Sequence, residues 1–162
     1  MIRALAPALL ALLPLQAAAQ TSLSLGSLNA DPDAPVEVTA ESLSVDQASG
    51  AAVFEGEVLI VQGEMRIAAA TVEVIYDDAS GEISRLEAVG GVTFVTPTEA
   101  AESNAAVYDI ASGMLTLTGE VLLTQSGTAL SAQSMVVDLN AGTARLEGGV
   151  RTVFEPQGQS AR

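Results

Sequence analysis

The sequence contains no cysteine, histidine, tryptophan or lysine. The absence of cysteine excludes disulfide bonds, thiol nucleophiles and thiolate metal ligands. The absence of histidine removes the side chain that most often serves as a general base. An enzyme would have to use closely spaced carboxylates, and the candidate pairs, Glu55 with Glu57 and Asp77 with Asp78, fall on a predicted outward strand face and in a predicted turn. We therefore predict no catalytic residue, no metal site and no cofactor.

Positive charge is scarce, because the chain has six basic residues, all arginine, and twenty acidic ones. Without the first 19 residues, which include Arg3, the balance becomes 5 − 20 = −15. A surface this acidic repels nucleic acid and anionic membrane headgroups. We therefore predict no nucleic-acid partner.

Long apolar runs are missing except at the N-terminus. Arg3 precedes a 12-residue apolar run from Ala4 to Leu15, and small residues follow at Ala17-Ala-Ala19. This order is typical of an export signal, and the run is shorter than the roughly 20 residues that a membrane span needs. We predict a cleaved signal peptide over residues 1–19 and a periplasmic protein, with an uncleaved membrane anchor as the alternative. Residues 20–35, which show no sustained period, are predicted to form a flexible leader.

What the sequence does contain is a repeat of about 30 residues. An Asp-x-x-x-Gly turn recurs with glycines 31, 32 and 29 residues apart, at Asp46 to Gly50, Asp77 to Gly81, Asp109 to Gly113 and Asp138 to Gly142. A Gly-Glu-Val or Gly-Gly-Val triplet follows each turn, and its valine lies eight residues after the turn glycine in the first, third and fourth units. In the second unit this distance is 11 residues, which indicates an insertion around Ile83 to Arg85. Such a period predicts stacked β units. Calcium loops are the alternative for the turns, but each offers one carboxylate and no closing bidentate glutamate.

Apolar and polar residues alternate with period two from Val36 onward, which predicts strands, and the short turns make successive strands antiparallel neighbours. Residues 100–106 are the one stretch where a helical turn is plausible, although their place in the repeat favours a strand. Every unit points its apolar residues to the same side, so stacking would enclose one continuous apolar interior. Only five aromatic residues are present, so this interior is lined by small and medium side chains. Both a packed core and a groove for alkyl chains fit this pattern.

The first unit combines an alternating strand of the form A-[DE]-x-L with the string G-x-x-x-[FY]-x-G-x-V-x-[VI]-x-Q-G. The positions that fit this pattern are Ala40, Glu41, Leu43, Gly50, Phe54, Gly56, Val58, Ile60, Gln62 and Gly63. In this the chain resembles the LptA/OstA-like family of periplasmic lipopolysaccharide-transport proteins. The second unit departs from it, since Val95-Thr-Pro97 replaces the Gln-Gly end. The resemblance covers about Val36 to Phe154. It implies an all-β, open β-jellyroll of about four repeats over residues 36–155, followed by a flexible C-terminal tail over residues 156–162.

The resemblance also implies a function. The domain would be a non-enzymatic bridge that shields the acyl chains of lipopolysaccharide between the inner and outer membranes. Its partners would be inner- and outer-membrane OstA-like components, or further copies end to end, docked on edge strands near Val36 to Ala40 and Val150 to Phe154. The alternatives are a secreted structural or adhesive β-repeat protein with a dry core, and the membrane-anchored OstA-like partner of the same pathway. The residues predicted to line the lipid-binding lumen are Val38, Leu43, Val45, Phe54, Val58, Ile60, Ile67, Val74, Tyr76, Phe94, Tyr108, Leu115, Leu117, Val121, Leu123 and Leu146.

Overall fold

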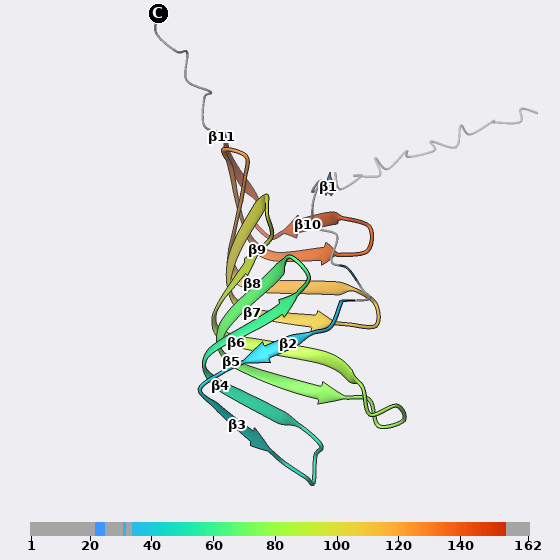
Figure 1. Cartoon of the computed structure of the whole chain (residues 1–162). Helices are drawn as coiled ribbons and strands as arrows, with labels where there is room; N and C mark the ends of the chain where they lie inside the picture. Colours follow the sequence, from blue (N-terminus) through green and yellow to red (C-terminus); the bar gives the residue numbers. More distant parts are fainter. Residues whose placement is uncertain (1–21, 25–30, 32–33, 155–162) are drawn as a thin grey trace, which may run out of the picture.

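The computed structural model of the chain describes residues 22–24, 31 and 34–154 (Figure 1). These residues form a single 11-stranded sheet and no helix. The strands are β1 (Ser22–Ser24), β2 (Glu37–Thr39), β3 (Ser42–Val45), β4 (Ala52–Gln62), β5 (Met65–Tyr76), β6 (Ile83–Val95), β7 (Glu99–Asp109), β8 (Met114–Gln125), β9 (Thr128–Asp138), β10 (Thr143–Glu147) and β11 (Arg151–Phe154). Residues 100–106 lie within β7, so the strand interpretation of that stretch is confirmed.

Successive long strands pair with each other in an antiparallel meander from β4 to β9. At the N-terminal end of the sheet, β2 and β3 both pair with β4. At the C-terminal end, β10 and β11 both pair with β9, and β1 pairs with the outer edge of β10. The prediction of an all-β, open and antiparallel architecture is confirmed.

The long strands bend at their middles, and the Gly-Glu-Val and Gly-Gly-Val triplets of the repeat lie at the bends of β4, β6 and β8 and between β10 and β11. The first two residues of each triplet have positive φ, as at Gly90 and Gly91 (88° and 85°) or Gly119 and Glu120 (81° and 50°). The pairing register shifts at the same places, for example between Thr118 and Val121. Glycine adopts this left-handed backbone without the steric cost that a side chain brings. The triplet is therefore a corner that folds the sheet in two.

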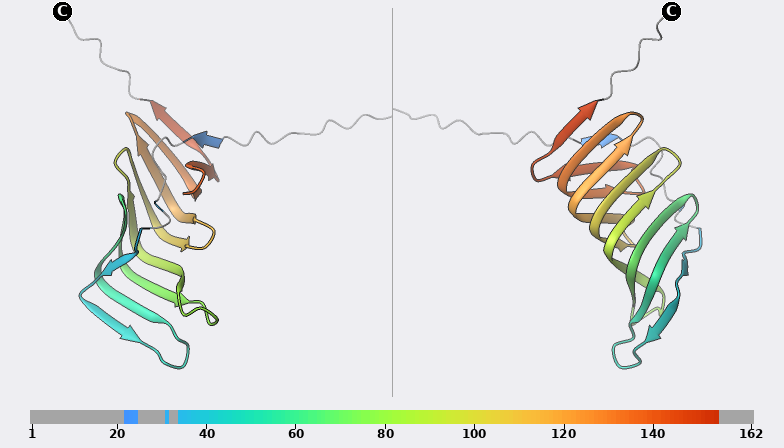
Figure 2. Two further views of the ribbon diagram at one scale, coloured as in Figure 1. Left: turned by 45° about the vertical axis from the view of Figure 1, so that its right-hand side comes forward. Right: turned by 90° about the vertical axis from the view of Figure 1, so that its left-hand side faces the viewer.

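The corners divide the sheet into two facing walls (Figure 2). The first, here called the Asp-turn wall, contains the strand halves that end at the Asp-x-x-x-Gly turns, together with β3 and β10. The second, here called the hairpin wall, contains the halves that end at the three tight hairpins, together with β2 and β11. Both walls turn their apolar side chains toward each other, so the interior lies in the fold of the sheet.

The four Asp-x-x-x-Gly segments are turns closed by their aspartates. Asp77 Oδ1 accepts hydrogen bonds from the amides of Ala79 (2.9 Å) and Ser80 (2.8 Å), and Gly81 N–H donates to the Asp77 carbonyl (2.8 Å). Asp46, Asp109 and Asp138 accept comparable bonds within their own turns. This is the Asx chemistry that favours aspartate at the start of a turn.

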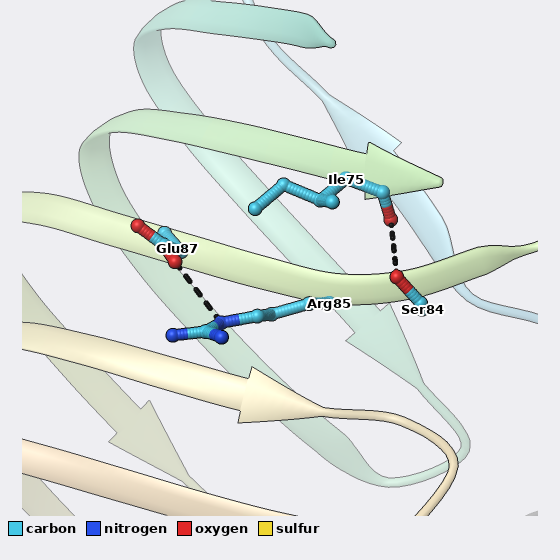
Figure 3. A network of polar contacts seen from close by, with 4 residues as sticks. All are labelled: Ile75, Ser84, Arg85 and Glu87. Atoms are coloured by element: carbon cyan, nitrogen blue, oxygen red, sulfur yellow. Dashed lines mark hydrogen bonds and ion pairs between the residues drawn. The ribbon is translucent and has the colours of Figure 1, made fainter. Parts of the chain in front are cut away.

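The insertion in the second repeat unit lengthens one hairpin of the Asp-turn wall. The hairpin between β5 and β6 projects beyond its neighbours (Figure 1), and Ser84 bulges out of the ladder between the pairs Tyr76–Ile83 and Ile75–Arg85. Ser84 Oγ donates to the Ile75 carbonyl (3.1 Å), and Arg85 forms an ion pair with Glu87 (3.0 Å) on the outer face (Figure 3). The insertion thus stays within the sheet.

The remaining segments differ in how much of them the structure describes. The predicted signal peptide (residues 1–19) and the predicted tail (156–162) lie outside the described residues. Within the predicted leader (20–35), β1 is a strand and Ala34 N–H donates to the Asp31 carbonyl (3.0 Å), so parts of this segment belong to the fold. The part of the chain that the structure describes holds no helix long and apolar enough to span a membrane.

Candidate functional site: the apolar interior and its two ends

The interior is built by strand alternation on both walls. On β8, Leu115, Leu117, Val121 and Leu123 are buried, whereas Thr118 and Thr124, which follow Leu117 and Leu123, are exposed. At the corner, the two residues with positive φ on β8 lie opposite a single residue of β9. The residues of β8 before and after the corner therefore keep their inward or outward orientation. The apolar face therefore continues from one wall around the corner to the other.

The structure places the sixteen predicted lumen residues in three groups. Eleven are buried: Val58, Ile60, Ile67, Val74, Phe94, Tyr108, Leu115, Leu117, Val121, Leu123 and Leu146. Val38 and Phe54 are partly buried against them. Leu43, Val45 and Tyr76 are exposed. The first two of these lie on the terminal strand β3, and Tyr76 is the last residue of β5, so they share the inward phase but lack neighbours on one side.

The predicted lumen set leaves out several inward residues that complete the core, although the alternation already gave Leu86, Val92, Met135 and Val137 the inward phase. The omitted residues are Met65, Val72, Leu86, Val92, Leu130, Met135, Val137 and Leu139, each at most 5% exposed. The alternation in β5, β6 and β9 carries the signal for most of them. Leu139 lies just outside the strands, and its amide donates to the Gly113 carbonyl (2.9 Å).

In the middle of the molecule the two walls are in close contact. The exposed fractions of Phe94, Leu115, Leu117, Leu123 and Met135 are all 0%. Interiors packed in this way leave few voids larger than a water molecule. In this state the middle of the interior is a packed core.

The C-terminal end of the interior is open. A cavity of about 480 Å³ lies between β9, β10 and β11, lined by Leu130, Leu146, Val150 and Phe154 together with the polar Gln125, Thr128 and Thr152. Leu130 and Leu146 are inward residues of the continuous core. Phe154 has the inward phase of β11 but is 73% exposed, because no further strand of the described residues pairs beyond β11. The cavity is a mouth of the interior.

The N-terminal end has a corresponding exposed apolar surface. Leu43 pairs with Phe54 and Val45 with Ala52, so both point to the inner side of the Asp-turn wall. Because β3 is the last strand there, Leu43 is 53% exposed. The predicted docking segments, residues 36–40 and 150–154, contain the terminal strands β2 and β11.

Polar groups are concentrated at the rim of the hairpin wall, where the strands reach the tight hairpins. The carboxylate of Glu99, 3% exposed, accepts hydrogen bonds from Thr96 Oγ1, Thr98 Oγ1 and Gln125 Nε2 (2.9 Å). Gln62 Oε1 accepts from the Tyr108 hydroxyl of the opposite wall (2.7 Å), and Gln62 Nε2 donates to the Ala34 carbonyl (3.2 Å). Burial and the nearby charge of Asp109 raise the pKa of Tyr108, so its hydroxyl is a neutral donor.

The outer surface is acidic and well solvated. Arg145 forms an ion pair with Glu147 on the outer face (3.6 Å), as Arg85 does with Glu87. Each such solvent-exposed ion pair contributes about 0–1 kcal/mol to the free energy of unfolding. In the turns, backbone hydrogen bonds lower the pKa of Asp46, Asp77 and Asp109. Asp109 Oδ1 also accepts a hydrogen bond from the Ser112 hydroxyl (2.8 Å).

The two closely spaced carboxylate pairs, Glu55 with Glu57 and Asp77 with Asp78, lie away from the apolar interior. Glu57 lies at a corner with φ of 45°, next to the exposed outer face, and Asp77 is engaged in its turn. Among the residues that the structure describes, no group of three or more carboxylates could hold a metal ion. The interior itself offers apolar surface bordered by a polar rim.

Comparison with known proteins links this geometry to one family. A family model described as "LptA/(LptD N-terminal domain) LPS transport protein" matches residues 37–143, more than half of the chain. The chain is 26% identical over 142 residues to the lipopolysaccharide export system protein LptH of Pseudomonas aeruginosa, covering 80% of each. It is 23% identical over 148 residues to an uncharacterised protein of Rhizobium meliloti, covering 85% of this chain and 80% of that one.

A solved structure agrees with the fold. The crystal structure of LptH from Pseudomonas aeruginosa, described as the LptA-homologous periplasmic component of the lipopolysaccharide transport device, matches with a TM-score of 0.69 and 19% sequence identity. The match covers 78% of this chain and 99% of that structure. At this identity the likeness establishes the fold, the folded antiparallel sheet described above.

Proposed function

We propose a function from the premise that the chain belongs to the LptA/(LptD N-terminal domain) family of LPS transport proteins. The protein is a non-enzymatic periplasmic carrier that holds the acyl chains of lipopolysaccharide between its two walls on the way from the inner to the outer membrane. The predicted signal peptide over residues 1–19 supports the periplasmic location. The curated relative that is named as a lipopolysaccharide export protein supports this assignment.

The observation that carries the proposal is the apolar inner face, which runs the length of the sheet and reaches solvent at both ends. At one end it forms the cavity beside Leu130 and Leu146, and at the other it exposes Leu43 and Val45. An interior that served only as a core would gain stability from covered ends. Open apolar ends suit a ligand or a second sheet that continues the interior.

The charge distribution favours binding through the tails. Burial of alkyl carbon stabilises a complex by roughly 0.8 kcal/mol per CH₂. The burial of several acyl chains therefore outweighs any contribution of the headgroup to the binding free energy. The outer surface is acidic and does not attract phosphorylated headgroups. The sugars therefore remain outside the folded sheet, and movement along the interior requires no specific polar contact.

The partners dock at the terminal strands. Edge strands with unpaired backbone groups bind further strands by β-augmentation. Here β2 and β3 end the sheet on one side, and β1 and β11 end it on the other. These edges suit inner-membrane and outer-membrane components with the same fold, or further copies of this chain joined end to end.

The test is a photo-crosslinking amino acid placed in the exported protein in cells that make lipopolysaccharide. Two inward positions, Leu146 at the C-terminal cavity and Leu117 in the middle, are each compared with an outward neighbour, Glu147 and Thr118. The proposal expects lipopolysaccharide adducts at both inward positions and few at the two outward ones. The matched neighbours control for expression and random encounter.

Other patterns of adducts would contradict the proposal in distinct ways. Adducts at Leu146 alone would limit the ligand to the C-terminal cavity. No adduct at either inward position, with the protein exported and folded, would favour the structural β-repeat protein with a dry core. N-terminal sequencing of the exported protein separates the soluble carrier, which begins at Gln20, from the membrane-anchored relative, which keeps its apolar segment.

A further inference from the structure

One buried hydrogen bond crosses the interior from wall to wall. The Tyr108 hydroxyl, at the rim of the Asp-turn wall on β7, donates to Oε1 of Gln62, at the rim of the hairpin wall on β4, over 2.7 Å. The two residues are 46 positions apart, and their exposed fractions are 3% and 2%. This bond therefore joins the two walls near the open long side of the fold, opposite the corners.

The same carboxamide also holds the leader. Gln62 Nε2 donates to the Ala34 carbonyl (3.2 Å), just before β2. Its oxygen and its nitrogen thus bond to different parts of the chain. The other polar groups at this rim are the buried Thr96 and Glu99 and the partly buried Gln125. They bond to one another within the hairpin wall and do not tie it to the opposite wall.

The packing around Tyr108 leaves no room for an alkyl chain. Its ladder partners Leu86 and Leu115 are 1% and 0% exposed, and the next inward residue on β8, Leu117, is also fully buried. A chain that enters the middle of the interior must part the walls there. When the walls part, the Tyr108–Gln62 bond breaks, and a buried polar group without a partner is strongly disfavoured.

We propose that the Tyr108–Gln62 hydrogen bond is a latch that keeps the middle of the interior closed in the lipid-free protein. Tyr108 and Gln62 act as positioning residues, because they set the separation of the walls. The inference rests on the proposed function for what enters, an acyl chain, whereas the latch itself can be measured without any lipid. The neutral Tyr108 hydroxyl has a proton to donate, and the Gln62 carboxamide oxygen accepts it without titrating. The latch bond therefore forms throughout the neutral pH range.

The first experiment measures the wall separation in lipid-free protein. Because the chain has no cysteine, spin labels can be placed at Glu64→Cys and Ala111→Cys, exposed positions near the two rims. Tyr108→Phe, which removes only the hydroxyl, is expected to lengthen and broaden the distance distribution. The matched control is Tyr76→Phe, since Tyr76 is the other tyrosine of the chain and is 40% exposed at the rim of β5.

The second experiment measures loading as the rate of adduct formation at Leu117. A typical net hydrogen bond corresponds to about a five-fold change in an equilibrium, so Tyr108→Phe is expected to load about five-fold faster than the parent. Gln62→Met should do the same, and the double variant should load no faster than either single one, because both remove the same bond. Gly81→Ala lowers stability through its positive φ (71°) but lies in a turn outside the interior and keeps the latch. It controls for general loss of stability and is expected to load at the parent rate.

The latch proposal is overturned if Tyr108→Phe gives the distance distribution of the parent, or if loading follows thermal stability, with Gly81→Ala as fast as Tyr108→Phe. If no variant and not even the parent forms an adduct at Leu117, the proposed function fails at that position. The lipid-free distances then still decide whether the latch exists.

Discussion

The middle of the interior and its two ends are built by the same alternation but differ sharply in exposure. Leu117 and Leu123 on β8 are fully buried, whereas Leu43 on β3 and Phe154 on β11, which have the same inward phase, are 53% and 73% exposed. The difference lies in the neighbours: a middle strand has a bent strand on each side, and an end strand has one. Burial in this fold is therefore a property of position in the stack, and each end is an unfinished core.

This comparison predicts its largest effect on stability in the middle. Leu117→Ala should lower the free energy of unfolding by about 2–5 kcal/mol, the usual range for a leucine truncated in a packed core. Leu43→Ala should cost less than about 1 kcal/mol, because its side chain already contacts water. Urea unfolding of the two variants measures both values. Equal losses would mean that the end is as well packed as the middle and that the comparison is mistaken.

A corner glycine should sharpen the same contrast. A Cβ on Gly90 (φ 88°) would lie 2.6 Å from Ala70 Cβ, whereas one on Gly81 (φ 71°), in the turn of the same hairpin, would have open space around it. Both substitutions to alanine carry the left-handed penalty of about 1–2 kcal/mol, and overpacking adds about 1–3 kcal/mol at Gly90 alone.

Urea unfolding checks this prediction, with Gly90→Ala expected to be the less stable of the two single variants. Adding Ala70→Gly removes the close contact and should recover part of the loss at Gly90. No recovery would show that backbone strain alone sets the cost of the corner.

These cases show how far the sequence alone leads. The turns and the inward phase follow from local chemistry, since Asp77 closes its own turn and each alternating leucine reports its own side of the strand. The corner could be located from Gly-Glu-Val and Gly-Gly-Val, but the sequence does not reveal that these glycines fold the sheet in two. That follows from contacts such as Gly90 with Ala70, which lie on different strands.

The rim and the ends were less accessible for the same reason. Gln62 stood out as part of a family pattern, yet its bond to Tyr108 joins residues 46 apart and depends on how the walls face each other. Glu99 reads as an ordinary surface carboxylate until the neighbouring hairpin brings Gln125 to it (2.9 Å). Leu43, Val45 and Tyr76 have the right phase for burial, but phase says nothing about which strand is last in the stack.

The exposed ends predict a smaller effect on assembly. Phe154→Glu should weaken end-to-end association of the chain, or its binding to a partner of the same fold, about ten-fold, because an apolar side chain is then lost from the docked surface. The control is Val153→Glu on the same strand, whose side chain points to the outer face. Sedimentation velocity over a range of concentrations measures association. Equal weakening by both variants would contradict docking through the inner face of β11.

The smallest effect is expected in the solvated turns, as a change in the pH dependence of stability. Hydrogen bonds from the Ser80 and Ala79 amides lower the pKa of Asp77 in the folded chain below its ordinary value of 3.8. A carboxyl group with a lowered folded pKa stabilises the fold above its unfolded pKa, and this contribution is lost as the pH falls through the folded pKa.

Asp77→Asn keeps an acceptor oxygen but does not titrate, so its urea midpoint should fall slightly at pH 7 and change less than that of the parent between pH 5 and pH 2. Asp78→Asn, at the adjacent carboxylate that receives neither amide, is the control. A parent and an Asp77→Asn variant with the same acid dependence would show that the turn bonds form equally well to the protonated acid, and that these turns, unlike the core they connect, contribute to the fold by geometry alone.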